Sequence, residues 1–338
     1  MPPRIALVMP FLNEERNLPA VLASLSRQRI DHARLRVIAV DNGSHDQGPA
    51  LVRAWLAAGD IDGSIVTATV RSIPHALNCG FAATHDDEIV VRLDAHTTYG
   101  ERYLEAIDAA LARLPPEVWC VGAAPSPGVQ ATFGLALHAA LFTNPVGLGP
   151  APFRTGTHEL EVDHVYLGAW RPGVVARVGG YDERWIANED AEFSERLRAL
   201  GGRIVRIALD ADLILTRGPL AAISQWHRYG TWRARTIRRH RSALRARHLA
   251  PPLALVTGTA LALSSRRRWL LPLVVLYAAA IVRNRRRGES PAVTTASIPF
   301  FIAVQIAYAL GLVRGAMTPV RDASVQDRGD DARYLKRT

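Results

Sequence analysis

Short apolar runs alternate with helical patterns over the first 125 residues. The runs that predict strands are residues 5–9, 35–40, 64–70, 88–93 and 118–123. Near-continuous apolar runs are typical of strands buried on both faces of a parallel sheet. Apolar residues recur with helical spacing between these runs, at 16–28, 48–58, 74–84 and 101–114. This alternation predicts βαβ units, so the expected fold class is α/β with a doubly wound sheet.

The pattern weakens in the middle of the chain and then changes in kind. Residues 124–165 are rich in Pro and Gly, which predicts a long loop with one short helix at 134–142. A helix is expected at 189–200, ended by Gly201 and Gly202. Three apolar stretches follow, at 249–265, 269–282 and 296–313. None reaches the roughly 20 apolar residues of a comfortable membrane span.

Charge divides the chain in the same place. The 338 residues carry a net charge of +10. Residues 1–215 hold 19 basic and 26 acidic groups, whereas residues 216–338 hold 22 basic and 5 acidic groups. Arginine clusters at 266–268 and 283–287 flank the second apolar stretch. If every stretch crossed a membrane, one cluster would face outward against the positive-inside tendency, so a re-entrant or interfacial hairpin is expected for the first two.

The ends of the chain and its cysteines indicate the cellular compartment. Only five apolar residues separate Arg4 from Pro10, too few for a signal peptide or a span, so a cytosolic N-terminus is expected. The tail after Ala316 is polar and expected to be disordered. Cys79 and Cys120 are the two cysteines, which makes a disulfide framework unlikely and favours a reducing cytosol.

Polar residues follow the predicted strands, where ligands of doubly wound sheets bind. Asp94-Ala95-His96 follows the fourth run, and a carboxylate two residues from an imidazole on an extended strand end can hold a divalent cation. Asp41-Asn42-Gly43-Ser44 follows the second run and Asn13-Glu14-Glu15 the first. Each segment also has a simpler interpretation, a solvated turn or a helix start.

Two further groups are candidates for chemistry. Glu189 and Asp190 begin a helix, where carboxylates stabilise the helix dipole or serve as a general base. Gln225-Trp226-His227-Arg228-Tyr229 opens a basic stretch that could clamp a phosphate or lie at a membrane surface. Each pair of interpretations stays open on the residues alone.

Taken in order, these segments resemble the family 2 glycosyltransferases of the GT-A fold. The residues that carry the resemblance are 8–15, 40–44, 77–80, 93–96, 179–182, 188–190, 196–197 and 201–202. Within that family the chain is most similar to the succinoglycan-biosynthesis, ExoA-like branch, through residues 92–96, 144–154, 162–163, 168–169 and 228–230. Enzymes of that branch extend polyprenyl-diphosphate-linked sugars at the cytosolic face of the membrane.

The resemblance implies a role for each matching position. Pro10, Glu14, Asp41 and Asn42 match the nucleoside-binding blocks, and Asp94 also belongs to the nucleotide-sugar site. Asp94 and His96 match a metal-binding Asp-x-Asp motif that holds Mn²⁺ or Mg²⁺. Asp190, beside Glu189, matches the base that deprotonates the acceptor hydroxyl. Asp163, Gln225, Arg228 and Tyr229 are assigned to the acceptor and its diphosphate. Three residues depart from the pattern: His96 replaces the second Asp, Leu12 replaces a base-stacking Tyr, and Tyr229 replaces a Trp.

The resemblance therefore implies an enzyme anchored at the cell membrane with its catalytic domain on the cytoplasmic side. We expect a Rossmann-like mixed sheet in a GT-A domain at 1–215, a basic interfacial helical segment at 216–250, membrane helices at 251–315 and a tail at 316–338. The expected activity is inverting transfer from a UDP-sugar to a polyprenyl-linked saccharide of a cell-surface polysaccharide. The alternatives are a polyprenyl-phosphate monoglycosyl synthase and a non-enzymatic basic protein that binds nucleotide at a membrane. A nucleic-acid partner is not expected, because the arginines interleave with apolar stretches, and a dehydrogenase is disfavoured because no Gly-x-Gly-x-x-Gly follows the first strand.

Overall fold

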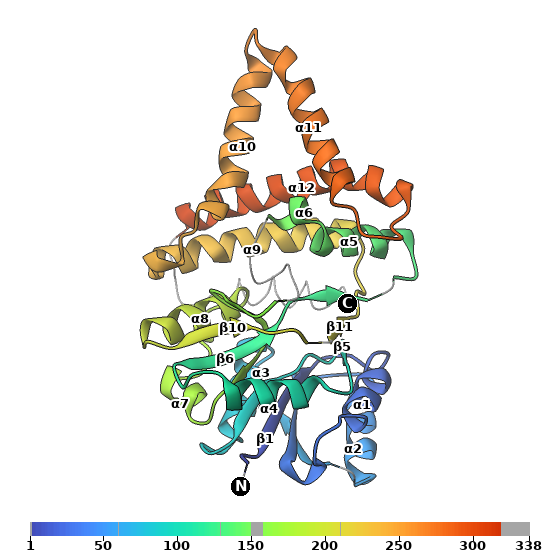
Figure 1. Cartoon of the computed structure of the whole chain (residues 1–338), viewed down its shortest axis with the longest axis vertical. Coiled ribbons are helices and arrows are strands. Elements are labelled where there is room, and N and C mark those ends of the chain that lie inside the picture. The colour runs from blue at the N-terminus through green and yellow to red at the C-terminus, as the bar shows by residue number, and fades with distance from the viewer. Residues whose placement is uncertain (1, 60, 129, 150–157, 210, 319–338) are drawn as a thin grey trace. The chain divides into compact units, whose positions relative to one another are not determined.

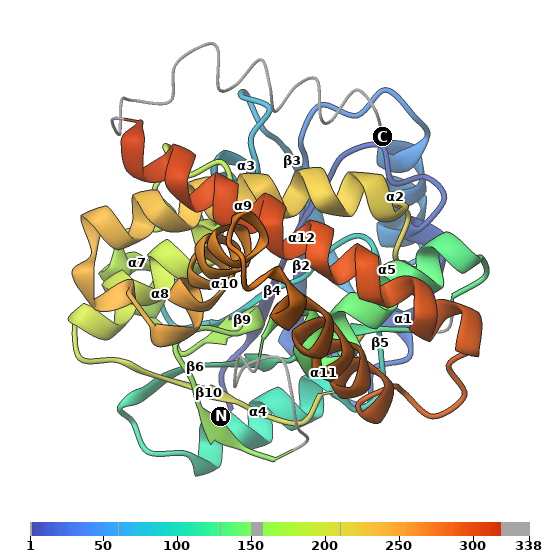
Figure 2. The same cartoon turned by 90° about the horizontal axis from the view of Figure 1, so that it is seen from above.

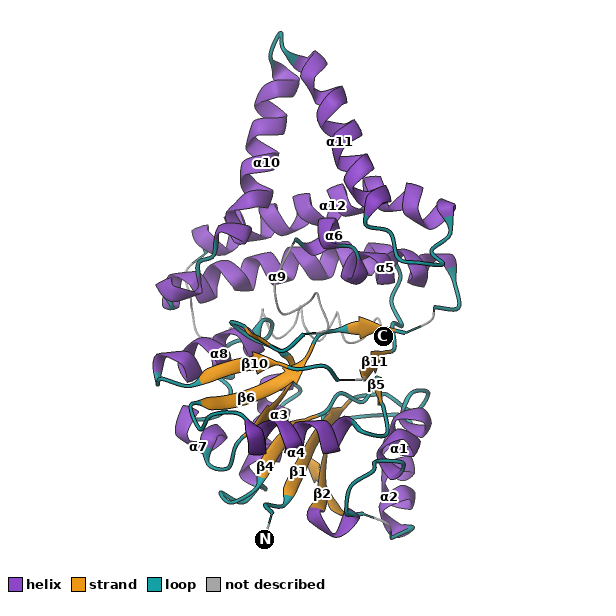
Figure 3. Cartoon of the chain, viewed as in Figure 1, coloured by secondary structure: helices purple, strands orange, loops and turns teal. Residues whose placement is uncertain are grey.

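The computed structural model describes residues 2–59, 61–128, 130–149, 158–209 and 211–318. These residues form two compact units. The first contains residues up to 125 and from 158 to 214, and the second contains residues 126–149 and 215–318. The expected boundary at 215 coincides with the later division, but residues 126–149 separate from the expected 1–215 domain and join the second unit. All of the long strands lie in the first unit, and the second is built of helices (Figure 3).

The first unit is built on an eight-stranded mixed sheet with the order β3-β2-β1-β4-β9-β6-β10-β8. Strands β1, β2, β3 and β4 run parallel, and β10 runs parallel to β6. Strand β9 is antiparallel to both of its neighbours, β4 and β6, and β8 is antiparallel to β10. The strands are β1 (Ile5–Phe11), β2 (Leu35–Asp41), β3 (Asp62–Thr67), β4 (Ile89–Arg92), β6 (Val118–Ala123), β8 (Leu160–Glu161), β9 (Tyr166–Trp170) and β10 (Arg203–Arg206). A short antiparallel pair, β5 (Thr97–Tyr99) and β11 (Ala211–Leu213), completes the unit's strands.

Burial explains why the apolar runs predicted the central strands. Every residue of β1 and β4 is buried, as expected for strands covered on both faces. Strand β3 contains no buried residue, because it lies at the edge of the sheet. The helices that cover the sheet are α1 (Leu18–Ser26), α2 (Gly48–Ala57), α3 (Ile73–Ala82), α4 (Tyr103–Arg113), α7 (Val174–Val178) and α8 (Glu189–Ala199) (Figure 1). Four of them lie within helices predicted from the sequence, α3 begins one residue before its predicted range of 74–84, and α7 was missed.

The second unit consists of α5 (Phe133–Thr143), α6 (Pro145–Leu148), α9 (Pro219–Arg239), α10 (Ala246–Leu263), α11 (Leu270–Arg283) and α12 (Pro291–Met317), with the short strand β7 (Ser126–Pro127). Helices α9 and α12 run side by side in both views (Figures 1 and 2). Their backbones touch at three glycines: a Cβ on Gly311 would lie 2.0 Å from the His227 carbonyl oxygen, and Gly230 and Gly315 are equally tight. An apolar cluster that includes Trp226, Phe300 and Phe301 closes the unit's core.

Two expectations for the later residues are only partly met. Residues 124–165 include α5 and α6 rather than one long loop with a single short helix. Of the expected disordered tail, only 316–318 are described, at the end of α12 and just after it. The rest of that tail, and Arg154, lie outside the described residues. Among the described helices, α12 is the one long and apolar enough to cross a membrane by length and composition.

Candidate functional site

Asp190 and Glu189 occupy the first turn of α8, as the sequence predicted. The residue before them, Asn188, has a left-handed backbone with φ of +58°, which turns the chain sharply into the helix. The Asp190 side chain is 34% exposed and that of Glu189 15%. The helix N-terminus favours negative charge at both positions.

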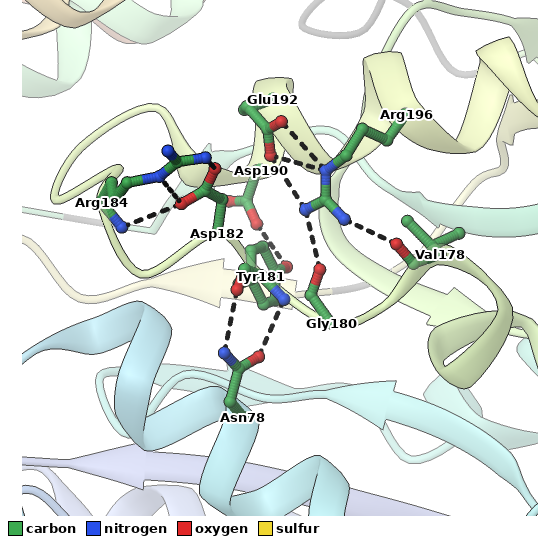
Figure 4. A network of polar contacts seen from close by, with 9 residues as sticks. All are labelled: Asn78, Val178, Gly180, Tyr181, Asp182, Arg184, Asp190, Glu192 and Arg196. Atoms are coloured by element: carbon green, nitrogen blue, oxygen red, sulfur yellow. Dashed lines mark hydrogen bonds and ion pairs between the residues drawn. The ribbon is translucent and has the colours of Figure 1, made fainter. Parts of the chain in front are cut away.

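The Asp190 carboxylate is held by a buried tyrosine. The Tyr181 hydroxyl donates to Asp190 Oδ1 over 2.7 Å. The Tyr181 backbone is in turn fixed by Asn78, which accepts the Tyr181 N–H at 2.8 Å and donates to its carbonyl at 2.9 Å (Figure 4). Arg196 secures the same loop, because it donates to the carbonyls of Val178 and Gly180 at 2.7 Å each while it pairs with Glu192 (Figure 4). Asp190 is therefore rigidly placed yet open to a reactant.

Arg92, the last residue of β4, links three carboxylates. Its guanidinium pairs with Asp190, lies 3.6 Å from Glu189 Oε1 and lies 3.5 Å from Asp94 Oδ1. The side chain is only 9% exposed. Burial alone would lower the pKa of Arg92, but Asp190 and Asp94 raise it well above its ordinary value, so the group stays charged. One cation thus joins the proposed base to the proposed metal ligand.

Glu189 differs electrostatically from its neighbour. Burial, followed by the charge of Asp190, raises the pKa of Glu189 to about 7, and Arg92 offsets only part of the shift. Burial and the adjacent Asp190 also raise the pKa of Tyr181, so that its hydroxyl keeps the proton it donates. The acidic pair consequently holds one carboxyl that is partly protonated near neutral pH beside another that receives two donors.

Asp94 and His96 do not lie on an extended strand as expected. Residues 95 and 96 form a turn closed by the Thr97 N–H, which donates to the Asp94 carbonyl over 3.3 Å. Strand alternation therefore gives no argument that the two side chains point the same way. The Asp94 carboxylate accepts the Tyr166 hydroxyl at 3.1 Å, and His96 Nδ1 lies 3.6 Å from Glu14 Oε1.

The donor set of this turn fits a divalent cation in kind but is small. A carboxylate and an imidazole are both ligands of Mn²⁺-type ions. Among the described residues, however, no group of three or more His, Cys, Asp or Glu side chains is arranged to hold a metal. A cation at Asp94 and His96 would need further ligands besides these two side chains.

The loops after β1 and β2 are tied to one another. The Asn13 N–H donates to Ser44 Oγ at 3.1 Å, and the His45 N–H donates to Asn13 Oδ1 at 2.9 Å. Asp41 ends β2, and its Oδ1 accepts the Ser44 N–H at 2.8 Å. These bonds fix the segments that the resemblance assigns to the nucleoside.

The four predicted nucleoside-site residues lie on or just beyond β1 and β2. Pro10 is buried within β1 and pairs with Val40 of β2. Glu14 Oε2 accepts the Asn17 amide at 2.6 Å just before α1. Asn42 is 1% exposed, and its Oδ1 accepts the Ser72 N–H at 3.1 Å. The structure thus places Glu14 beside His96 and Asn42 beside the start of α3.

The predicted acceptor residues divide between the two units. Asp163 lies between β8 and β9, with its Oδ1 3.2 Å from His164 Nδ1. Gln225 and Tyr229 lie on α9 of the second unit, where the Gln225 amide donates to the Tyr229 hydroxyl at 2.8 Å, and Arg228 lies on the same helix. The carboxylate cluster of the first unit, which consists of Asp94, Glu189 and Asp190 with Arg92, Tyr166 and Tyr181, includes none of these four.

Three residues of the cluster were absent from the predicted site. Arg92 was noted only as part of a motif, and Tyr166 and Tyr181 were not assigned a role. Arg92 belongs to an apolar strand run, where a buried charge signals a partner, and this was the available clue. The tyrosines carry no comparable signal, because their partners lie elsewhere in the chain.

The fold agrees with the comparisons to known proteins. The family model described as "Glycosyl transferase family 2" matches residues 6–167. The match confirms the resemblance to that family, and the protein is a glycosyltransferase with a GT-A fold.

Particular relatives extend this finding over most of the chain. Succinoglycan biosynthesis protein ExoA of Rhizobium meliloti (strain 1021) is 29% identical over 251 residues, which cover 72% of this chain and 73% of that protein. The mannosyltransferase PcManGT from Pyrobaculum calidifontis, solved with GDP-Man and Mn²⁺, has a TM-score of 0.64 at 21% identity and covers 93% of this chain and 88% of its own. S. aureus TarS 1-349 has a TM-score of 0.51 at 13% identity, covering 90% and 89%. The two structures show a shared fold.

Proposed function

We propose that this glycosyltransferase moves a sugar from a UDP-sugar to a polyprenyl-linked saccharide in the synthesis of an exopolysaccharide. The proposal for the pathway is supported by the likeness to the succinoglycan protein. The nucleotide-sugar donor is supported by the PcManGT structure, which holds GDP-Man, and by the fixed loops after β1 and β2. The choice of UDP remains an expectation from the sequence.

The observation that carries the mechanism is the placement of Asp190. Its carboxylate is anchored by Tyr181 and Arg92 on one side and remains one-third exposed on the other. A general base needs this combination of fixed position and access to the proton it removes. Asp190 accepts the proton of the acceptor hydroxyl as its oxygen bonds to the anomeric carbon. The bond from that carbon to the diphosphate breaks in the same displacement, the electron pair leaves with the diphosphate, and the configuration inverts.

A divalent cation fits this scheme at Asp94 and His96. Mn²⁺ is present in the PcManGT structure, which supports the proposal. When bound, such an ion offsets the negative charge of the leaving diphosphate. Tyr166 and Arg92 hold Asp94 for that purpose, and Glu14 orients His96.

For the acceptor, Arg228 on α9 offers a cation for the lipid-linked diphosphate, with Gln225 and Tyr229 on the same helix. Asp163 of the first unit is a separate candidate for contact with the acceptor. A lipid-linked acceptor places the enzyme at the cell membrane with its site on the cytoplasmic face. The basic segment near α9 would favour anionic lipid there.

Transfer can be tested on membranes that contain the protein. Labelled nucleotide-sugars are offered with Mn²⁺ or Mg²⁺, and label is counted in the lipid extract. Asp190→Asn should abolish transfer while nucleotide binding persists, because the amide keeps the shape but accepts no proton. Asp212→Asn, at an exposed position of β11, is the control and should transfer normally. Transfer at the wild-type rate by Asp190→Asn would refute the assignment of the base.

The cation site has a separate test. Asp94→Ala should remove the dependence of donor binding on Mn²⁺, which can be measured by calorimetry with and without the ion. Equal Mn²⁺ dependence in the wild type and in this variant would contradict the role given to Asp94. Donor affinity without added metal then shows how much the nucleoside loops contribute alone.

A further inference from the structure

Helices α10 and α11 form a hairpin with an unusual surface. From residue 249 to residue 276, no position is buried by the rest of the described chain. Large apolar side chains are open along it, including Leu253 at 62%, Val256 at 67%, Leu271 at 71% and Leu276 at 66% exposure. The two helices project from α12 and meet at their connection (Figure 1). Soluble monomers rarely expose an apolar surface this extensive, so the hairpin must be covered by something else.

The distribution of apolar residues around α11 indicates what covers the hairpin. Successive residues of a helix turn by about 100° around its axis. Leu271, Leu273 and Val274 are each at least 45% exposed and therefore point to three different sides. A second protein covers one side of a helix, whereas hydrocarbon covers all of them. The occupant indicated by α11 is a lipid bilayer.

Helix α12 meets the length criterion for a span, but its packing argues against that role. It lies against α9 through the close contacts of Gly311 and Gly315. Helix α9 carries five arginines, at 228, 233, 235, 238 and 239. Hydrocarbon around α12 would have to accommodate these charges as well, which is costly. The long apolar helix thus belongs with the basic helix outside the hydrocarbon.

We propose that α10 and α11 cross the bilayer as a helical hairpin and place Arg266, Arg267 and Arg268 among the headgroups of the far leaflet. At 1.5 Å per residue, the 18 residues of α10 and the 14 of α11 span roughly 27 and 21 Å. The hydrocarbon core is about 30 Å thick. Arginines at both ends of α11 extend toward the headgroups, and local thinning supplies the remainder.

This arrangement replaces the re-entrant or interfacial hairpin expected from the sequence. A re-entrant hairpin would leave three arginines in the hydrocarbon, and an in-plane hairpin would leave one side of α11 in water. Arginine counts also set the orientation. Nine arginines flank the base of the hairpin, at 238, 239, 241, 245, 247, 283, 285, 286 and 287, against three at its tip. The base therefore lies on the cytoplasmic side, together with the chain on either side of the hairpin.

Thiol labelling tests the crossing directly. The two native cysteines are removed as Cys79→Ser and Cys120→Ala, and one cysteine is introduced by Ser265→Cys at the tip or Ser242→Cys at the base. Both serines are exposed and adjacent to an arginine, which makes them a matched pair. A membrane-impermeant maleimide added to intact spheroplasts should label the tip variant, and the base variant should react only after permeabilisation. Labelling of the tip only after permeabilisation would overturn the proposal.

A second measurement tests whether the hairpin itself holds the protein in the membrane. Leu276→Arg should move a large part of the protein from the carbonate-resistant membrane fraction to the supernatant. Leu200→Arg, at an exposed leucine of the first unit (46%), should remain in the membrane. Wild-type protein that is soluble without detergent as a dimer would show that a second copy covers the hairpin. These readouts do not require sugar transfer, so the hairpin and the proposed function can fail separately.

Discussion

Tyr181 offers the sharpest test of the proposed base, because a single oxygen atom can be removed without changing the fold. Its ring is 3% exposed and packs between Phe81 and Phe193, with centroids 5.7 and 4.9 Å away. Tyr181→Phe keeps this packing and deletes the donor to Asp190. A hydrogen bond to a charged group contributes about 1.5–3 kcal/mol. Asp190 is one-third exposed, so water screens the contact and the lower end applies.

That energy sets the expected displacement of the pH profile. About 1.4 kcal/mol corresponds to one pH unit of proton affinity. Losing the Tyr181 donor removes a hydrogen bond that favours the charged form of the site over its protonated form. The acidic limb of kcat against pH should therefore move upward by about one unit, while the plateau at high pH falls little. The assay is lipid-extract labelling at saturating donor across pH 5 to 9.

Tyr166→Phe is the matched control. This buried tyrosine donates to Asp94 at 3.1 Å as Tyr181 donates to Asp190. Its loss should weaken the apparent affinity for Mn²⁺ and donor without moving the acidic limb of kcat. An unmoved limb in Tyr181→Phe, or equal movement in both variants, would refute the role given to Asp190 as the base.

The remaining predictions concern charge and close packing. Glu189 has a folded-state pKa of about 7 against an ordinary 4.5, so its contribution to the free energy of unfolding falls as pH rises between these values. Glu189→Gln should therefore stabilise the protein above pH 7 by up to about 3 kcal/mol and have little effect at pH 4.5, as measured by denaturant titrations at both pH values. Gly180 has φ of +65°, and a Cβ there would lie 2.7 Å from Asn78 Oδ1; Gly180→Ala should cost about 2 kcal/mol and lower kcat, with a melting temperature and a rate as readouts. Gly311→Ala should disrupt the contact between α9 and α12, at a cost of about 1–3 kcal/mol, and so lower the melting temperature of the detergent-solubilised protein. The control is Gly258→Ala in α10, where a Cβ would meet nothing within 4 Å and the melting temperature should not change. A wild-type melting curve for Gly311→Ala would contradict the close contact.

The sequence predicted the parts of the fold that depend on local pattern. Strands β1, β2 and β6 follow from apolar runs that are buried on both faces, and α8 follows from its acidic first turn and the glycines after it. Strand β9 was missed, because its five residues contain a glycine and directly follow the stretch rich in Pro and Gly. Its identity depends on pairing with β4 and β6, which is a tertiary effect.

The candidate site shows the same division. The carboxylates at the strand and helix ends were recognisable from residue type and position. The role of Arg92 was not, because its partner Asp190 lies 98 residues further along the chain. The turn at Asp94 to His96 was one of two interpretations left open, since an apolar run does not reveal where a strand ends and the chain bends. The roles given to Asp163, Gln225, Arg228 and Tyr229 stay predictions.

The position of β9 between β4 and β6 has a consequence for how the protein is made. Strands β1 to β4 are complete once residue 92 has left the ribosome. The second neighbour of β4, which is β9, begins only at residue 166. Until then the fully buried strand Ile-Val-Val-Arg presents an unpaired edge, the kind of edge on which chains associate with one another. A fragment cut before β9, although it contains both nucleoside loops, should therefore aggregate rather than behave as an isolated donor-binding domain. The shortest useful catalytic fragment must extend past Trp170 to α8 and β10.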